Sequence, residues 1–532
     1  MRRGRQPLQY HVPRVDRSSA LVAFGILCSR LTGFIRQRFF AQYFGLSDSA
    51  DAFMAAFRIP NFLQNLFGEG ALSASFIPVY AALVAREERE EAARVAGAVA
   101  ALLALVTGIL VLLGVLATPL LVALIAPGFE GDKRQLTIAI VRILFPGAGL
   151  LVLSAWCLGI LNSHRRFLLS YIAPVTWNVS MIVALVWWGK VTPLPRLAVI
   201  LAFGALAGSA LQMLVQLPTV LKLVPNLRFR LEFSEHVRAT VRNFLPVFVS
   251  RGVVQISAYI DEVLASLLPT GAVTGLANAQ LLYTLPVSLF GLSVSAAALP
   301  AMSGAVGLNA IDALRDRVNT GLRHIAFFVV PSAMAFLTLG DVVAASLFQT
   351  GRFTYGDAVY VWGILAGSSI GLLATTLARL YSSTFYALRD TRTPLRFALV
   401  HVGIATVLGY LAAIVLPPLM GIEPVWGTIG LTTAASIAGW VELLLLRRSL
   451  NRRIGQTGLP LGLGVRLWSA AFVAAAVAWG IKLMVLEAHP ILRAALILLP
   501  FGAVYLGLTV VFGVTEARGV LARVRRTNST GG

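Results

Sequence analysis

Apolar runs of 18 or more residues recur from one end of this 532-residue chain to the other. A run of that length can cross the hydrocarbon layer of a membrane as a helix. Only 13% of the residues are charged, whereas an ordinary soluble protein has about 25%. We therefore expect an all-α polytopic membrane protein with about 14 transmembrane helices, whose function is built from helices and short loops.

The apolar runs divide into fourteen predicted spans, and the charge of the loops between them alternates. The spans lie at roughly 18 to 44, 51 to 83, 95 to 117, 135 to 161, 168 to 188, 197 to 221, 243 to 267, 276 to 301, 324 to 344, 358 to 387, 397 to 415, 426 to 446, 467 to 485 and 494 to 512. The termini and even-numbered loops hold 30 Lys and Arg residues, against 6 in the odd-numbered loops. Because basic loops stay on the cytoplasmic side, this asymmetry predicts that both termini are cytoplasmic. The net charge of +21 is then a topology signal with some attraction to anionic lipids, and it requires no nucleic acid.

The titratable residues show no catalytic or metal-binding pattern. Cys28 and Cys157 fall in apolar spans, and the six histidines are scattered singly. No phosphate-binding G-x-x-x-x-G-K-[ST] loop is present. We expect neither an enzyme nor a cofactor. Membrane potential, worth about 2.3 kcal/mol per elementary charge per 100 mV, or ions of unknown identity would drive any transport.

Proline, glycine and other turn residues recur with a shift of 222 to 226 positions, as in Pro60 with Pro286 and Pro78 with Pro300. Because six spans separate the copies, a pseudo-twofold axis along the membrane normal would relate two six-helix bundles, with the cargo site between them. Chance recurrence of Gly and Pro is the alternative. The predicted divisions are an N-terminal segment at 1–17, bundles at 18–222 and 243–449, a linker at 223–242, two extra helices at 450–513 and a tail at 514–532.

Eight cations lie inside the predicted spans, where each costs roughly 2.5 to 3.5 kcal/mol at the middle of a bilayer. They are Arg30, Arg36, Arg38, Arg58, Arg142, Arg251, Arg379 and Lys482. Such residues mark polar cavities or internal ion pairs. Arg38 and Lys482 lie near span ends, so we expect them to snorkel to the membrane surface. Arg142 and Arg379 occupy corresponding places in the two halves, and we expect structural or coupling roles for them.

The second span carries a polar stripe. At 100° per residue, an arc of roughly 80° collects Asp51, Arg58, Asn61, Asn65 and Glu69. Unpaired polar groups are costly in hydrocarbon, so we expect the stripe to face protein or water. Pro60 interrupts the helix within the stripe and can bend it. Arg58 and Asn61 are candidates for a cargo cavity, whereas Glu69 is better read as an ion-pair partner.

The first span combines small residues with two arginines. The small residues at i, i+4 and i+8 are Gly25, Ser29 and Gly33. This spacing lets another helix backbone approach closely. Arg30 points about 120° away from Arg36, so their guanidinium groups need not share a partner. One could pair with Asp51 or Glu69, and the other could bind an anionic cargo, because a guanidinium fork fits phosphate oxygens and stays charged.

The seventh span holds charges of both signs, at Arg251, Asp261 and Glu262. This mixture is compatible with an internal ion pair. It is equally compatible with a protonatable acid that couples to transport. The residues alone leave both interpretations open.

The segment from residue 29 to 80, SRLTGFIRQRFFAQYFGLSDSADAFMAAFRIPNFLQNLFGEGALSASFIPVY, resembles the signature of the MurJ (MviN) family of bacterial lipid II flippases. Further similarity follows in order at APGF (126–129), RILFP (142–146), GILNSHRRF (159–167), APVTWN (173–178), LFQTGRFT (347–354) and FYALRDTRTP (385–394). The resemblance implies a transporter of the multidrug/oligosaccharidyl-lipid/polysaccharide superfamily in the bacterial inner membrane. It would move lipid II, the lipid-linked peptidoglycan precursor, to the outer leaflet by alternating access, with the polyprenyl tail along the two extra helices. We expect a monomer among membrane lipids.

The resemblance also implies roles for particular residues. The family's essential first-span arginines fall on Arg30 and Arg36, and its acid at the start of the second span falls on Asp51. Its Pro-Asn and Glu-Gly-Ala elements fall on Pro60, Asn61, Glu69, Gly70 and Ala71. Together with Arg58, these arginines would form a cationic cavity for the pyrophosphate.

The sequence departs from the family pattern at two places. Gln64 and Asn65 stand where many members have a basic pair, and Gln280 and Leu281 stand where they carry Asp-Arg. We hypothesise that Arg251 replaces the missing cations. One alternative function is a related exporter of drugs or of another lipid-linked oligosaccharide. The other is a membrane enzyme acting on polyprenyl phosphates, which would need paired acids or metal ligands at a membrane face.

Overall fold

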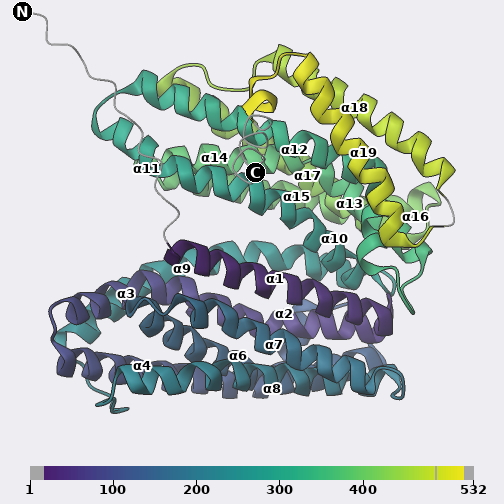
Figure 1. The fold of residues 1–532 in the computed structure, drawn as a ribbon. Coiled ribbons are helices and arrows are strands. Elements are labelled where there is room, and N and C mark those ends of the chain that lie inside the picture. The colour runs from purple at the N-terminus through teal and green to yellow at the C-terminus, as the bar shows by residue number, and fades with distance from the viewer. Residues whose placement is uncertain (1–16, 486–487, 520–532) are drawn as a thin grey trace, which may run out of the picture. The chain divides into compact units, whose positions relative to one another are not determined.

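The computed structural model describes residues 17–485 and 488–519 (Figure 1). Within these ranges, the side chains of residues 17–20, 23, 69–71 and 245–258 are not described, and the predicted site residues Glu69 and Arg251 are among them. The described residues form helices joined by loops and contain no strand. The predicted all-α class is confirmed.

Residues 17–223 form eight helices. They are α1 (Arg17–Phe44), α2 (Asp48–Phe67), α3 (Glu69–Ala85), α4 (Arg89–Leu116), α5 (Thr118–Ile125), α6 (Gly131–Ser163), α7 (Phe167–Trp188) and α8 (Leu194–Leu223).

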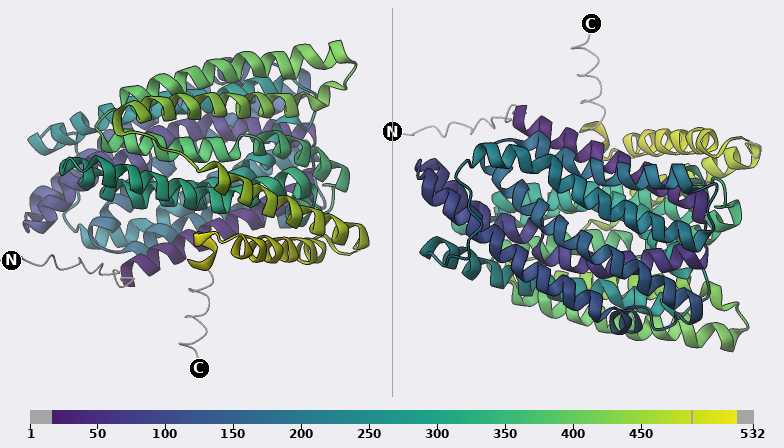
Figure 2. Two further views of the ribbon diagram at one scale, coloured as in Figure 1. Left: turned by 90° about the horizontal axis from the view of Figure 1, so that it is seen from above. Right: turned by 90° about the horizontal axis from the view of Figure 1, so that it is seen from below.

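The next series begins with α9 (Glu235–Ser266), α10 (Ala272–Pro286), a π-helical segment (Val287–Leu292), α11 (Ser293–Gly307), α12 (Ile311–Phe348), α13 (Tyr355–Ser369) and α14 (Leu372–Ala387). It ends with α15 (Arg392–Tyr410), a second π-helical segment (Leu411–Val415), α16 (Leu416–Met420), a 3-10 turn (Pro424–Trp426), α17 (Gly427–Ile454), α18 (Leu461–Met484) and α19 (Pro490–Val511). Helices α18 and α19 lie side by side in Figure 1 and in both views of Figure 2.

Eleven helical segments of the described residues are long and apolar enough to cross a membrane. The number is twelve if α13 and α14, bent by 45° at their junction, form one span. Helices α1 and α9 have 28 and 32 residues but carry several charges each. The protein is therefore a multi-span membrane protein, and the count of fourteen stays a prediction that would require α1 and α9 to cross as well.

Left-handed backbone recurs with the spacing of the sequence repeat. Glu87 (φ 61°) and Asn309 (φ 53°) are 222 positions apart, and Arg165 and Arg389 (φ 58° each) are 224 apart. Residues other than glycine seldom adopt this conformation, so two pairs at the predicted shift support a repeated architecture. Each pair ends a corresponding helix, α3 with α11 and α6 with α14. The predicted symmetry axis itself stays a prediction.

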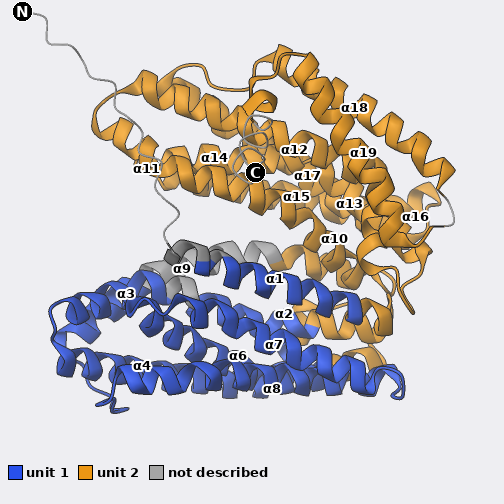
Figure 3. Ribbon diagram, viewed as in Figure 1, with its two compact units in different colours: residues 1–39, 56–121, 138–255 blue, residues 40–55, 122–137, 256–532 orange. Residues whose placement is uncertain are grey.

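The chain forms two compact units (Figure 3). Unit 1 comprises residues 1–39, 56–121 and 138–255, and unit 2 comprises residues 40–55, 122–137 and 256–532. Unit 2 thus includes the turn between α1 and α2 and the segment leading into α6. The predicted bundle boundaries at 222 and 243 stay predictions.

Candidate functional site

Unit 1 contains a polar cavity of about 780 Å³ between its membrane-spanning helices. Amide and hydroxyl groups dominate its lining, which is formed by Ser29, Arg36, Phe57, Asn61, Gln64, Asn65, Gly68, Ser73, Leu151, Ser154, Ala155, Leu158, Pro174, Trp177, Asn178 and Gln212. Arg36 is the one cation among these lining residues. The cavity is in the size range of small-molecule sites, and its polar lining would be costly to expose to lipid.

Aromatic rings hold the Arg36 side chain in the cavity wall. Its guanidinium carbon lies 4.8 Å from the ring centre of Trp177 on α7 and 6.0 Å from that of Phe57 on α2. A guanidinium nitrogen also lies 3.8 Å from the sulfur of Met181. Cation–π contacts of this kind are worth about 0.5 to 2 kcal/mol. They position the guanidinium group without neutralising it, and no described carboxylate forms an ion pair with it, so its charge is available to an anion.

Hydrogen bonds from Asn178 tie α7 to α1 beside Arg36. Its side-chain amide donates to the Ser29 carbonyl at 3.5 Å and to the Thr32 hydroxyl at 3.4 Å. Further along, a Cβ added at Gly25 would lie 2.7 Å from the Cβ of Tyr171, which leaves no room for a side chain there. Small residues thus allow α1 to pack closely on α7 and to present Arg36 beside Trp177.

A second polar wall comes from α6 and α8. The side-chain amides of Gln212 and Gln216 donate to the Ser154 hydroxyl at 3.1 and 2.6 Å. Because Gln212 and Ser154 both line the cavity, this wall is fixed by bonds inside unit 1.

The residues predicted for the cargo cavity occupy different environments. Arg36 and Asn61 line the cavity. Arg30 is exposed and Arg58 is half-buried, and neither is part of its lining. Pro60 is buried within α2. Cargo binding by Arg30 and Arg58 stays a prediction.

The residues predicted for structural or coupling roles are also dispersed. Arg142 on α6 and Arg379 on α14 are exposed. On α9, Asp261 is half-buried, and the side chain of Glu262 is buried. Coupling by any of them stays a prediction.

Asp51 is the centre of a separate hydrogen-bonded cluster, which lies wholly in unit 2. Its carboxylate is 1% exposed and accepts hydrogen bonds from the backbone N–H groups of Gly271 and Thr274 at 2.8 and 2.9 Å, at the start of α10. The Thr274 hydroxyl donates to it at 2.7 Å, and Lys133 pairs with it at 2.9 Å. Lys133, and neither first-span arginine, is therefore the ionic partner of Asp51. Lys133 was predicted in a loop, where no sequence pattern connects it with α2.

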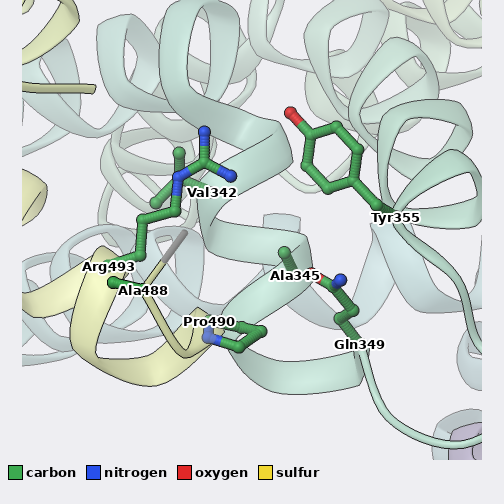
Figure 4. A pocket seen from close by; sticks show the side chains of 7 residues that line it. All are labelled: Val342, Ala345, Gln349, Tyr355, Ala488, Pro490 and Arg493. Carbon is green, nitrogen blue, oxygen red and sulfur yellow. The ribbon is translucent and has the colours of Figure 1, made fainter. Parts of the chain in front are cut away.

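Lys482 forms a buried ion pair, so the prediction that it snorkels is wrong. Its ammonium group lies 2.8 Å from Asp341 on α12, and the two residues are 8% and 1% exposed. The Tyr355 hydroxyl donates to the same carboxylate at 2.7 Å. Next to this group is a cavity of about 480 Å³ into which Arg493 and Tyr355 project (Figure 4).

A family model described as "Lipid II flippase MurJ" matches residues 40–498. This chain belongs to the MurJ family. The probable lipid II flippase MurJ of Rhizobium meliloti (strain 1021) is 32% identical over 468 residues, which cover 86% of this chain and 84% of the relative. The lipid II flippase MurJ of Burkholderia cenocepacia is 31% identical over 512 residues, covering 92% and 96%.

Solved structures show the same fold. "Lipid II flippase MurJ, inward closed conformation" superimposes with a TM-score of 0.76 at 24% identity, covering 93% of this chain and 99% of that one. An inward-facing multidrug resistance MATE family transporter of the MOP superfamily gives a TM-score of 0.65 at 17% identity, covering 82% and 98%.

Sequence reasoning missed the aromatic residues that position Arg36 in this MurJ family member. Trp177 falls inside the APVTWN motif, and Phe57 comes just before Arg58 on α2. A Trp in an apolar span is usually a core or interface residue, so the residue type did not indicate that Trp177 contacts a cation. Only the packing of α1 against both α2 and α7 brings these side chains together.

Proposed function

We propose that this chain is a transporter that moves lipid II from the cytoplasmic to the outer leaflet of the bacterial inner membrane. The supporting observation is a polar cavity with an unneutralised arginine inside a membrane-spanning bundle, in a chain that matches its family along most of its length. A charged headgroup cannot cross hydrocarbon unaided, because burial of isolated charge costs tens of kcal/mol by idealised estimates. The polar groups that line the cavity would take the place of water around that headgroup.

In this proposal, Arg36 binds the pyrophosphate group of the cargo. A guanidinium group presents parallel N–H donors that match phosphate oxygens. The amides of Asn61, Asn178 and Gln212 would bind the uncharged hydroxyl and amide groups of the headgroup. Because the lining holds one cation, phosphate binding would depend on Arg36, with Arg251 as the proposed substitute for the cations that other members carry.

The loop charges support a topology in which both termini of the protein lie in the cytoplasm. The polyprenyl tail would stay in lipid beside α18 and α19. Membrane potential acting on the cationic cavity, or coupled ions, would reset the empty transporter.

Rescue of a bacterium depleted of its own flippase tests the cargo. We expect the wild-type chain to restore growth and the exposure of lipid-linked precursor at the outer surface. Arg36→Ala should abolish rescue at unchanged membrane abundance, because it removes the one cation of the cavity lining. Arg30→Ala should also abolish rescue, because we propose that this second first-span arginine meets the cargo outside the cavity. Arg36→Lys should rescue only in part, since an ammonium group lacks the planar fork.

The control is Arg466→Ala, which removes an exposed arginine of α18 and should rescue fully. Failure of the wild type despite membrane expression would contradict the lipid II assignment and favour export of another lipid-linked oligosaccharide. Full rescue by Arg251→Ala would show that this residue does not replace the missing cations.

A further inference from the structure

A basic recess lies at the C-terminal end of α17 in unit 2. It has a volume of about 530 Å³ and is lined by Leu444, Arg447, Arg448, Asn451 and Arg452. The next residue, Arg453, pairs with Asp390 at 2.6 Å. Among the described residues, no carboxylate forms an ion pair with the three arginines of the recess, so their positive charge is open to an external anion.

The side chain of Arg447 is fixed in place by the loop that follows α17. Its Nε donates to the Thr457 carbonyl at 2.9 Å, and the Thr457 N–H donates in turn to the Asn451 side chain at 2.9 Å. The loop passes so close that a Cβ added at Gly458, where φ is +143°, would lie 2.7 Å from the Arg447 guanidinium. Only glycine suits this position. The hydrogen bond to Thr457 and the close approach of the loop hold Arg447 in its orientation before any ligand arrives.

Arg448 and Arg452 complete the recess. They are exposed and four residues apart, so they are neighbours on one face of the helix. Like charges at this spacing repel by a few tenths of a kcal/mol, although the helix C-terminus partly offsets this. A bound anion would remove the repulsion. The oxygen of the Asn451 side chain already accepts from Thr457, so the polar groups that the recess presents to a ligand are N–H donors, most of them on guanidinium groups, as phosphate recognition requires.

The recess also lies at the right depth for a lipid headgroup. Helix α17 belongs to the candidate span Pro424–Ile454, and the three arginines fall in its last eight residues. Four leucines at 443–446 directly precede them, so acyl chains can follow the helix while a phosphate reaches the guanidinium groups. Loop charge predicts that this end faces the cytoplasmic leaflet, where anionic lipids attract basic groups.

We propose that the recess formed by Arg447, Arg448 and Arg452 binds the phosphate headgroup of an anionic phospholipid. This site is additional to the transport cavity of unit 1. Its occupation requires no cargo.

Native mass spectrometry of the full chain in detergent, titrated with phosphatidylglycerol, tests the proposal. Arg448→Gln combined with Arg452→Gln should weaken phosphatidylglycerol binding about 30-fold, because each basic residue near an anionic headgroup contributes about fivefold. Both side chains are exposed, so the variant should fold normally. The matched control, Arg317→Gln with Arg323→Gln, removes two exposed arginines of α12 and should change binding less than about twofold.

Equal binding by the two double variants would overturn the proposal, since net charge alone would then explain the affinity. If millimolar inorganic phosphate displaces phosphatidylglycerol as effectively as added phospholipid does, the lipid assignment is overturned, because the ligand would then be free phosphate. Arg36→Ala should retain phosphatidylglycerol binding, and this result separates failure of the recess from failure of the transport proposal.

Discussion

At the scale of single residues, burial distinguishes two aspartates that share one lysine. Asp48 and Asp51 both lie 2.9 Å from the ammonium group of Lys133. The Asp48 side chain is 60% exposed, whereas that of Asp51 is 1% exposed. Water screens the first pair, and protein groups alone balance the second.

Lys133→Met should therefore destabilise the protein by about 3 to 5 kcal/mol, because it leaves the Asp51 charge buried without its cation. Asp48→Asn, the control in the same cluster, should cost less than about 1 kcal/mol. Unfolding of the purified protein in mixed micelles measures both. If the two variants are equally stable, the buried pair contributes no more than the exposed one.

At the scale of helices, the start of α15 depends on the turn before it. Asp390 accepts hydrogen bonds from the Thr393 hydroxyl at 2.7 Å and from the Arg392 and Thr393 N–H groups at 3.0 Å. The hydroxyl and N–H of Thr393, together with Arg453, lower the pKa of Asp390 from 3.8 to about 2. The carboxylate thus satisfies N–H groups that the first turn of a helix leaves free.

Asp390→Asn should lower the unfolding temperature at pH 6, where the wild-type carboxylate is charged. A pKa lower in the folded than in the unfolded state gives stability that is present above about 3.8 and is lost as the pH falls toward 2. The difference between wild type and variant should therefore shrink from pH 6 to pH 3. Asp390 is half-buried but its partner Arg453 is exposed, so water screens the pair and the full effect should stay below about 1 kcal/mol. A difference that grows on acidification would contradict this.

At the scale of the whole molecule, each unit has its own buried core and its own polar ties. In unit 2, the ion pair of Lys482 with Asp341 joins α18 to α12. The Tyr505 hydroxyl donates to the Phe327 carbonyl at 2.7 Å and joins α19 to the same helix. The two extra helices are thus bonded to α12 by buried polar contacts, which are costly to break where water is scarce.

Lys482→Met should loosen α18 and α19 and cost about 3 to 5 kcal/mol, because Asp341 would keep a buried charge. Adding Asp341→Asn should restore much of the loss, since the remaining group is neutral. Thermal unfolding and protease sensitivity of the segment after α17 measure this. Arg466→Met, on the exposed face of α18, is the control. A double variant as unstable as the single one would refute the ion-pair account.

The sequence by itself determined the all-helical membrane class and the approximate spans, because these depend on hydropathy within a short stretch of chain. The shift of the repeat was also readable from the sequence, because Gly and Pro mark the turns and breaks of each helix. It also pointed to Arg36 and Asn61 of the cavity through the polar character of their spans. Only the tertiary structure decided the partners, which are Trp177 for Arg36, Lys133 for Asp51 and Asp341 for Lys482. These pairs are 82 to 141 positions apart. Their contacts depend on which helix faces pack together, and helical periodicity fixes the face of a residue but not the neighbour across from it.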